Sequence, residues 1–110
     1  MILVTTDEIP GRRIARTLGL VRGSSVRARP LTRDIMALFR NMVGGEIPEY
    51  TKMLAESREQ ALDRMFAEAK ALGADAVVGI RFVTSQIMSG AAELLVYGTA
   101  VVLEENPGGS

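Results

Sequence analysis

A long helical stripe in the second half of the chain restricts its fold more than any other feature. Pro48 suits a first helical position, where a missing N–H costs nothing, and Gly73 suits a helix stop. The helix predicted over residues 48–72 would be about 37 Å long at about 1.5 Å per residue. That exceeds the reach of a compact monomer of 110 residues, whose radius of gyration should be about 13 Å. Its apolar positions share one helical stripe: Tyr50, Met53, Leu54, Ala61, Leu62, Met65, Phe66, Ala69 and Leu72.

The residues before this helix predict two strands and a shorter helix. A first strand over residues 2–5 ends at a turn signal, and a second is expected over residues 13–29. Gly19 and Gly23 break its alternation and indicate bulges or bends. Thr32 is a candidate N-cap for a short amphipathic helix that Gly44-Gly45 ends.

The residues after the long helix predict an antiparallel hairpin. Its strands are expected over residues 76–87 and 93–103, with a turn around Ser89-Gly90. Both alternating faces of the last strand are largely apolar, and two helices in one chain can cover only one of them. The elements therefore predict an α+β domain with two helices on one face of antiparallel strands, and a partner subunit over the other face.

Length and composition favour one domain, expected over residues 1–103 and followed by a disordered tail over residues 104–110. The chain has no cysteine, which excludes disulfides and thiolate chemistry. The apolar start is too short for a signal peptide, and no run of about 18 apolar residues offers a membrane span. A cytoplasmic location is the expectation.

The zero net charge hides an asymmetry between two parts of the chain. Residues 1–40 carry eight Arg against three acids, whereas residues 41–110 carry five bases against ten acids. The two parts, at +5 and −5, could attract each other within a subunit or between subunits. A basic surface for an anionic ligand is the less favoured reading.

Several motifs resemble those of the YbjQ family, small bacterial and archaeal proteins also catalogued as heavy-metal-binding domains. The resemblance extends from Thr5 to Val102 and implies a β-β-α-α-β-β order and a homopentameric ring with strands reaching between subunits. It supplies no activity. The motifs are Arg33-Asp34, Val43-Gly44-Gly45, Tyr50, Arg58-Glu59, Leu72-Gly73-Ala74-Asp75-Ala76-Val77-Val78-Gly79 and Tyr97-Gly98-Thr99.

Heavy-metal binding conflicts with the ligand chemistry of this chain. Soft and borderline metals need Cys thiolate or His imidazole, and the chain has neither. Its internal Met residues fall on helical stripes or strand ends, where core packing is favoured over thioether ligation. Glu56, Glu59 and Asp63 share one helix face and could attract a hard cation, but a solvated face is the favoured reading.

An enzyme is not favoured, because the chain lacks a His base, a Cys nucleophile and any recognisable triad or phosphate loop. Arg33, Asp34, Tyr50 and Arg58 could converge near Gly44-Gly45. An ion pair that braces the connection between the two helices is favoured there over ligand binding.

Nucleic-acid binding is also disfavoured, since no aromatic residues interleave the N-terminal Arg residues and the total charge is neutral. The sequence thus predicts a homo-oligomeric scaffold or small-ligand-binding protein without catalytic residues or a cofactor. The alternative is an enzyme or metal-handling protein whose site forms between subunits.

Overall fold

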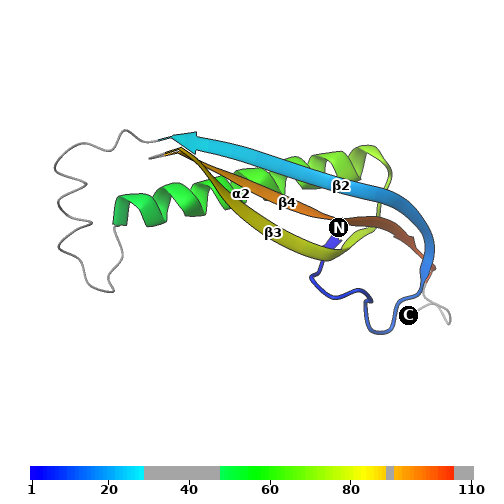
Figure 1. Cartoon of the computed structure of the whole chain (residues 1–110). Coiled ribbons are helices and arrows are strands. Elements are labelled where there is room, and N and C mark those ends of the chain that lie inside the picture. The colour runs from blue at the N-terminus through cyan, green and yellow to red at the C-terminus, as the bar shows by residue number, and fades with distance from the viewer. Residues whose placement is uncertain (29–47, 89–90, 106–110) are drawn as a thin grey trace, which may run out of the picture.

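The computed structural model describes residues 1–28, 48–88 and 91–105, which form one helix and four strands (Figure 1). The fold is therefore α+β, as the sequence predicts. The described part places one helix, not two, against the sheet; the short helix expected after Thr32 and the turn at Ser89-Gly90 lie outside it. The elements are β1 (Ile2–Leu3), β2 (Ile14–Ala28), α2 (Pro48–Ala71), β3 (Ala76–Met88) and β4 (Ala91–Leu103).

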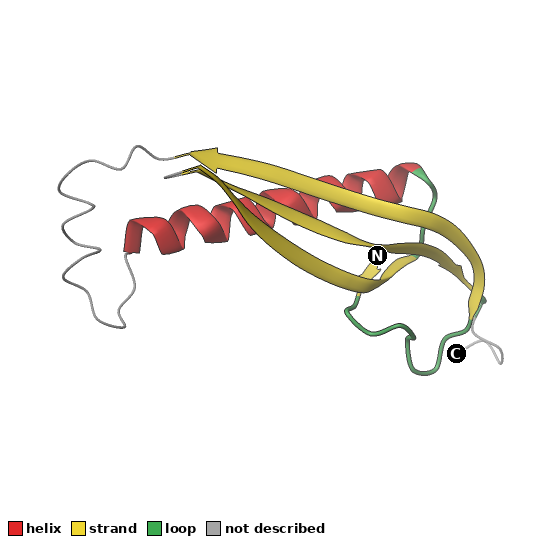
Figure 2. Ribbon diagram, in the orientation of Figure 1, coloured by secondary structure: helices red, strands yellow, loops and turns green. Residues whose placement is uncertain are grey.

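The strands form one mixed sheet in the order β1-β3-β4-β2. β4 pairs antiparallel with both β2 and β3, whereas β1 pairs parallel with the start of β3. The expected hairpin of β3 and β4 is confirmed. Three long strands thus lie side by side, with α2 along one face (Figure 2). The other face of the sheet is called the open face below.

α2 begins and ends where the sequence predicts. Gly73 adopts a φ of 82°, which lets the chain leave the helix. Two backbone hydrogen bonds close the end, from Gly73 N to Lys70 O at 3.0 Å and from Ala74 N to Ala69 O at 3.1 Å. This pattern is a Schellman motif. Among the described residues, no helix combines the length and the apolar character that crossing a membrane would require.

One hydrophobic core lies between α2 and the sheet. α2 packs mainly on β2 and β4. At Gly23 an added Cβ would contact Ala61 O and lie 2.5 Å from Met65 N, so the two backbones nearly touch. Gly23 pairs with Val96 in regular register, so the β-bulge expected there is not found; the register shifts of β2 lie at Ile14/Arg16 and Thr17/Gly19. The buried residues of this core are Val21, Ala61, Met65, Ala69, Val77, Ile80, Leu94, Val96 and Ala100.

A second, smaller cluster lies on the open face. Val4 and Ile9, from the segment after β1, pack against Ala76, Val78, Val101 and Leu103. The N-terminal segment therefore covers one end of the face that the sequence analysis assigned to a partner subunit. The rest of that face has no such cover within the described residues.

The molecule is elongated rather than compact. Its radius of gyration is 18.3 Å and its principal extents are 62 × 25 × 16 Å, against about 13 Å for a compact chain of this length. α2 lies along the long sheet (Figure 1). The length of the helix alone therefore does not require a partner subunit.

Candidate functional site

The predicted cluster around the connection between two helices falls mostly outside the described residues. This holds for Arg33, Asp34, Gly44 and Gly45. Tyr50 lies in the first turn of α2, where only the backbone is described, and Arg58 is exposed further along the helix. Their convergence stays a prediction.

The three carboxylates proposed as a cation site lie on α2 and are exposed. They are Glu56, Glu59 and Asp63. No group of three acidic, His or Cys residues in the described part of the chain is arranged to hold a metal ion. These carboxylates therefore share a helix face without forming a metal-binding group.

The thioether groups fit a heavy metal no better. Met65 is fully buried in the core, whereas Met1 precedes β1 and is 43% exposed, and Met88 is the last residue of β3 and is 64% exposed. Since β1 pairs with the start of β3, these two thioethers lie at opposite ends of that strand. Since the chain has no His or Cys, soft-metal ligands would have to come from such scattered methionines. The described residues do not fit a heavy-metal site.

Polar contacts join α2 to the distal half of β2, which the sequence analysis did not predict. Ser25 and Ser57 are both buried, and their hydroxyls hydrogen-bond to each other. Arg27 Nη2 donates to Gln60 Oε1 at 3.0 Å, and Arg64 Nη1 donates to the carbonyl of Ser24 at 2.6 Å. The apolar core thus continues into a polar interface. The serines gave no signal because Ser25 and Ser57 are 32 residues apart and belong to no sequence motif.

A shallow hollow of about 400 Å³ lies in the loop before β2, lined by residues 8–14. Arg12 Nη2 donates to the carbonyl of Glu104 at 3.3 Å, while its buried Nε has no partner among the described residues. Every lining residue comes from one continuous segment. Apart from the Glu104 carbonyl bonded to Arg12, the structure places no group from another described segment at this hollow.

The distal part of β3 is exposed along its whole length. All eight residues of its segment 81–88 are exposed. β1 pairs only with Ala76 and Val77, so the outer edge of this segment has no neighbouring strand within the described residues. Four large apolar side chains lie here: Phe82 (44% exposed), Val83 (44%), Ile87 (52%) and Met88 (64%).

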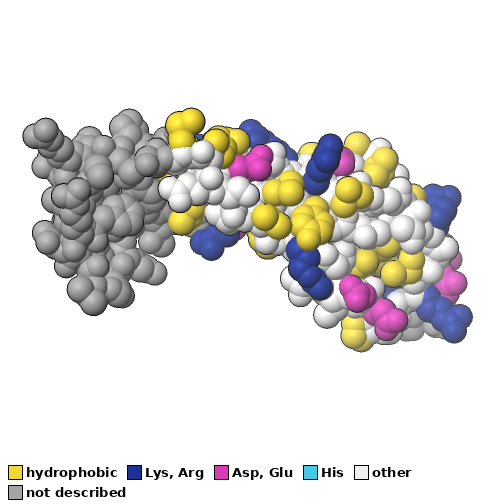
Figure 3. Space-filling model, viewed as in Figure 1, with side chains coloured by type: hydrophobic (Ala, Val, Ile, Leu, Met, Phe, Trp, Pro, Cys, Tyr) yellow, Lys and Arg dark blue, Asp and Glu magenta, His cyan; other side chains and the backbone are white. Residues whose placement is uncertain are grey.

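The open face adds further exposed apolar groups to this edge. Leu20 and Val26 on β2 are 63% and 58% exposed. Their partners on β4, Thr99 and Glu93, show that both side chains stand on the face opposite the core. Figure 3 shows hydrophobic side chains along the middle of the molecule, with Lys and Arg between them. This face and the free edge of β3 form the candidate interaction surface.

Comparison with known proteins places the chain in a family. A family model described as "Putative heavy-metal-binding" matches residues 1–104. A UPF0145 protein of Methanosarcina acetivorans is 56% identical over 101 residues, covering 92% of this chain and 95% of the relative. A UPF0145 protein of Thermus thermophilus is 58% identical over 104 residues, covering 94% and 91%. A relative in Pyrococcus abyssi is 59% identical with the same coverage.

A solved structure shares the fold. It is the crystal structure of a protein of unknown function from Pediococcus pentosaceus, with a TM-score of 0.60 and 15% identity. The alignment covers 94% of this chain and 98% of that one. At this identity, the likeness concerns the fold alone. The sequence matches over nearly the whole length are what establish the family: the chain belongs to the YbjQ family, together with these UPF0145 proteins.

Proposed function

We propose that the protein is a homo-oligomeric scaffold or small-ligand-binding protein, assembled through the free edges of its sheet. The observation that carries the proposal is the exposed segment 81–88 of β3. An open strand edge with exposed apolar side chains pairs readily with another chain. A second copy of the same chain supplies such a partner.

The two outer strands of the long part of the sheet suit a head-to-tail contact. These strands are β2 and β3, which flank β4 on either side. Both run antiparallel to β4 and hence parallel to each other. The β2 edge of one copy can therefore lie beside the β3 edge of the next, over about 26 Å for eight residues.

Contacts of this kind use two different surfaces of each copy, so they repeat around a ring when the rotation closes. A ring would leave no copy with a free β3 edge. Five copies is the number that the family resemblance implies.

A noncatalytic role agrees with the residues of the chain. There is no His or Cys to act as base or nucleophile. A metal-handling site between subunits would need carboxylate or thioether ligands from two copies, and no observation favours one. Binding and scaffolding therefore remain the proposed function.

Native mass spectrometry of the full chain tests the assembly. The expected spectrum shows one closed multimer, and a monomer at micromolar concentration would contradict the proposal. Val83→Lys places a charge on the exposed β3 edge, where lysine opposes strand pairing, and is expected to shift the multimer to monomer.

Ala67→Lys is the matched control for this substitution. Ala67 is exposed on α2, two residues from the buried Met65 and thus on the side of the helix away from the core. This variant should keep the multimer. Equal loss of assembly in both variants would count against the β3 edge as the contact.

A further inference from the structure

Three side chains form a row across the middle of the open face. Tyr97 on β4 is paired with Arg22 on β2 and with Arg81 on β3. Directly paired residues carry their side chains on the same face of a sheet. Because Val96, the neighbour of Tyr97, lies in the core, the row faces away from α2. A phenol ring therefore lies between two guanidinium-bearing residues.

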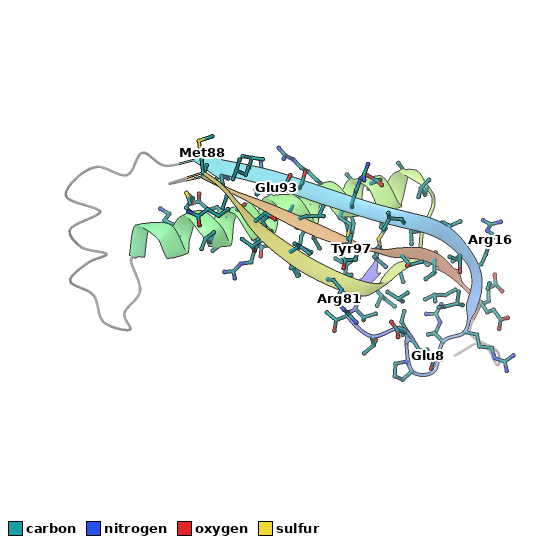
Figure 4. All side chains as sticks on the ribbon, in the orientation of Figure 1. Glu8, Arg16, Arg81, Met88, Glu93 and Tyr97 are labelled. Atoms are coloured by element: carbon teal, nitrogen blue, oxygen red, sulfur yellow. The ribbon has the colours of Figure 1, made fainter. Side chains whose placement is uncertain are left out.

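The spacing of the row is set by the sheet. Paired Cα atoms are about 4.5–5.5 Å apart, so the two Arg backbones are about 10 Å apart. Tyr97 is half-buried, whereas both Arg residues are exposed. Figure 4 shows Arg81 beside Tyr97 on the neighbouring strand.

Backbone carbonyls hold one of the two guanidinium groups in place. Arg81 Nη1 donates to the carbonyls of Thr5 at 2.7 Å and of Ile80 at 2.8 Å. These two bonds use both hydrogens of that nitrogen and leave the Nη2 and Nε hydrogens for other acceptors. Thr5 belongs to the segment after β1, which crosses this end of the open face. The guanidinium of Arg81 is therefore anchored beside Tyr97.

The row itself is positive. It contains two Arg and no carboxylate. On β4 the nearest acidic residue of this face is Glu93, four residues away and about 13 Å along the strand. From the segment after β1, Asp7 Oδ1 lies 3.5 Å from the position that a Cβ would take on Gly79, two residues before Arg81. Two cations beside an aromatic ring attract an anion, and guanidinium groups bind phosphate and carboxylate oxygens in a bidentate manner.

We infer that Arg22, Tyr97 and Arg81 bind a small aromatic molecule that carries an oxyanion, either phosphate or carboxylate. The flat ring of the ligand stacks on Tyr97, and its oxyanion accepts hydrogen bonds from a flanking guanidinium. All three side chains come from one copy, although Arg22 and Arg81 stand on the outer strands β2 and β3 that the proposed assembly would pair. The site therefore goes beyond the proposed assembly and needs no residue of a second copy.

Equilibrium dialysis with AMP and 2-naphthoate tests the inference and separates phosphate from carboxylate. At least one of these is expected to bind saturably. Adenosine, which lacks the anion, and pyrophosphate, which lacks the ring, should compete at least about tenfold more weakly. Failure of both aromatic anions to bind would overturn the inference, as would equal competition by pyrophosphate.

Substitutions locate the binding. Arg22→Gln should raise the dissociation constant of the probe about tenfold or more, because it removes a charged hydrogen-bond donor. Tyr97→Leu should raise the same dissociation constant about fivefold or more, because the ligand ring loses its stacking partner. Arg16→Gln is the control, because it removes the same charge from an exposed site of β2 outside the row.

If Arg22→Gln or Tyr97→Leu binds the probe as tightly as the parent does, the proposed role of that residue is contradicted. If Arg16→Gln weakens binding as much as Arg22→Gln does, the effect comes from total positive charge and not from the row. Native mass spectrometry of the same samples counts subunits independently. Loss of assembly without loss of binding, or the reverse, therefore tells the two proposals apart. Thermal melting confirms that each variant is folded.

Discussion

At Gly23 the backbones of β2 and α2 approach each other with no side chain between them. The sequence indicated an exceptional backbone at this position, but the reason differs from the expected one. Glycine is needed here because a Cβ would collide with the backbone of α2, and not because the strand bends. Gly19, in contrast, has a φ of 121° and lies next to a register shift, as the broken alternation predicts.

Gly23→Ala is expected to destabilise the fold by about 3 kcal/mol or more, since the new methyl group meets backbone atoms that cannot rotate away. Urea denaturation at fixed protein concentration measures the change. Ser24→Ala, next to it on the opposite face of β2, should cost far less. A parent-like stability of the Gly23 variant would show that α2 can move away from the sheet without loss.

At the scale of elements, the sequence predicts α2 and the hairpin well because their signals are local. The apolar stripe, Pro48 and Gly73 define the helix without reference to the rest of the chain. Alternation and β propensity do the same for β4. The position of α2 over β2 and β4 depends on contacts between distant residues, and no local pattern indicates it.

The sequence predicts an apolar face of β4 that the helices leave uncovered, but the same limit explains why it does not predict the free edge of β3. Adjacent apolar residues at Phe82-Val83 and Ile87-Met88 show that β3 carries apolar groups on both faces. Only the placement of α2 shows that, within residues 1–28, 48–88 and 91–105, no element covers either face of this segment. Tyr97 was noted as part of a family motif, but its two Arg partners depend on strand register.

The buried hydroxyl pair of Ser25 and Ser57 joins β2 to α2 and should behave as a unit. Either single Ser→Ala variant leaves one buried hydroxyl without its partner, at a cost of about 1–3 kcal/mol. The double variant is expected to cost less than the sum of the two. A double-mutant cycle from urea denaturation checks this, and simple additivity would show that the hydroxyls do not depend on each other.

At the scale of the whole molecule, the lack of His and Cys predicts that the protein does not bind heavy metals. Untagged protein should keep the same melting temperature after chelator treatment and after addition of Zn²⁺, Cd²⁺ or Cu⁺, because no His or Cys is present to bind them. Elemental analysis after dialysis should find no stoichiometric metal. Ca²⁺ and Mn²⁺ should also leave the melting temperature unchanged.

A change in melting temperature with Ca²⁺ or Mn²⁺ would support the hypothesis of a cation site on α2. If Ca²⁺ or Mn²⁺ raised the melting temperature of the parent and not that of Glu59→Gln, a hard-cation site at Glu56, Glu59 and Asp63 would be established. A retained soft metal would instead require ligands from more than one copy.

The elongated shape also affects how the protein moves through solution. A particle of 62 × 25 × 16 Å meets more friction than a sphere of the same 11.9 kDa mass. A single copy would therefore diffuse slowly and leave a gel-filtration column early, at the position of a larger globular protein. Copies arranged side by side in a ring would be rounder, so their frictional ratio should fall as their mass rises. Sedimentation velocity, which separates mass from shape, would detect both changes.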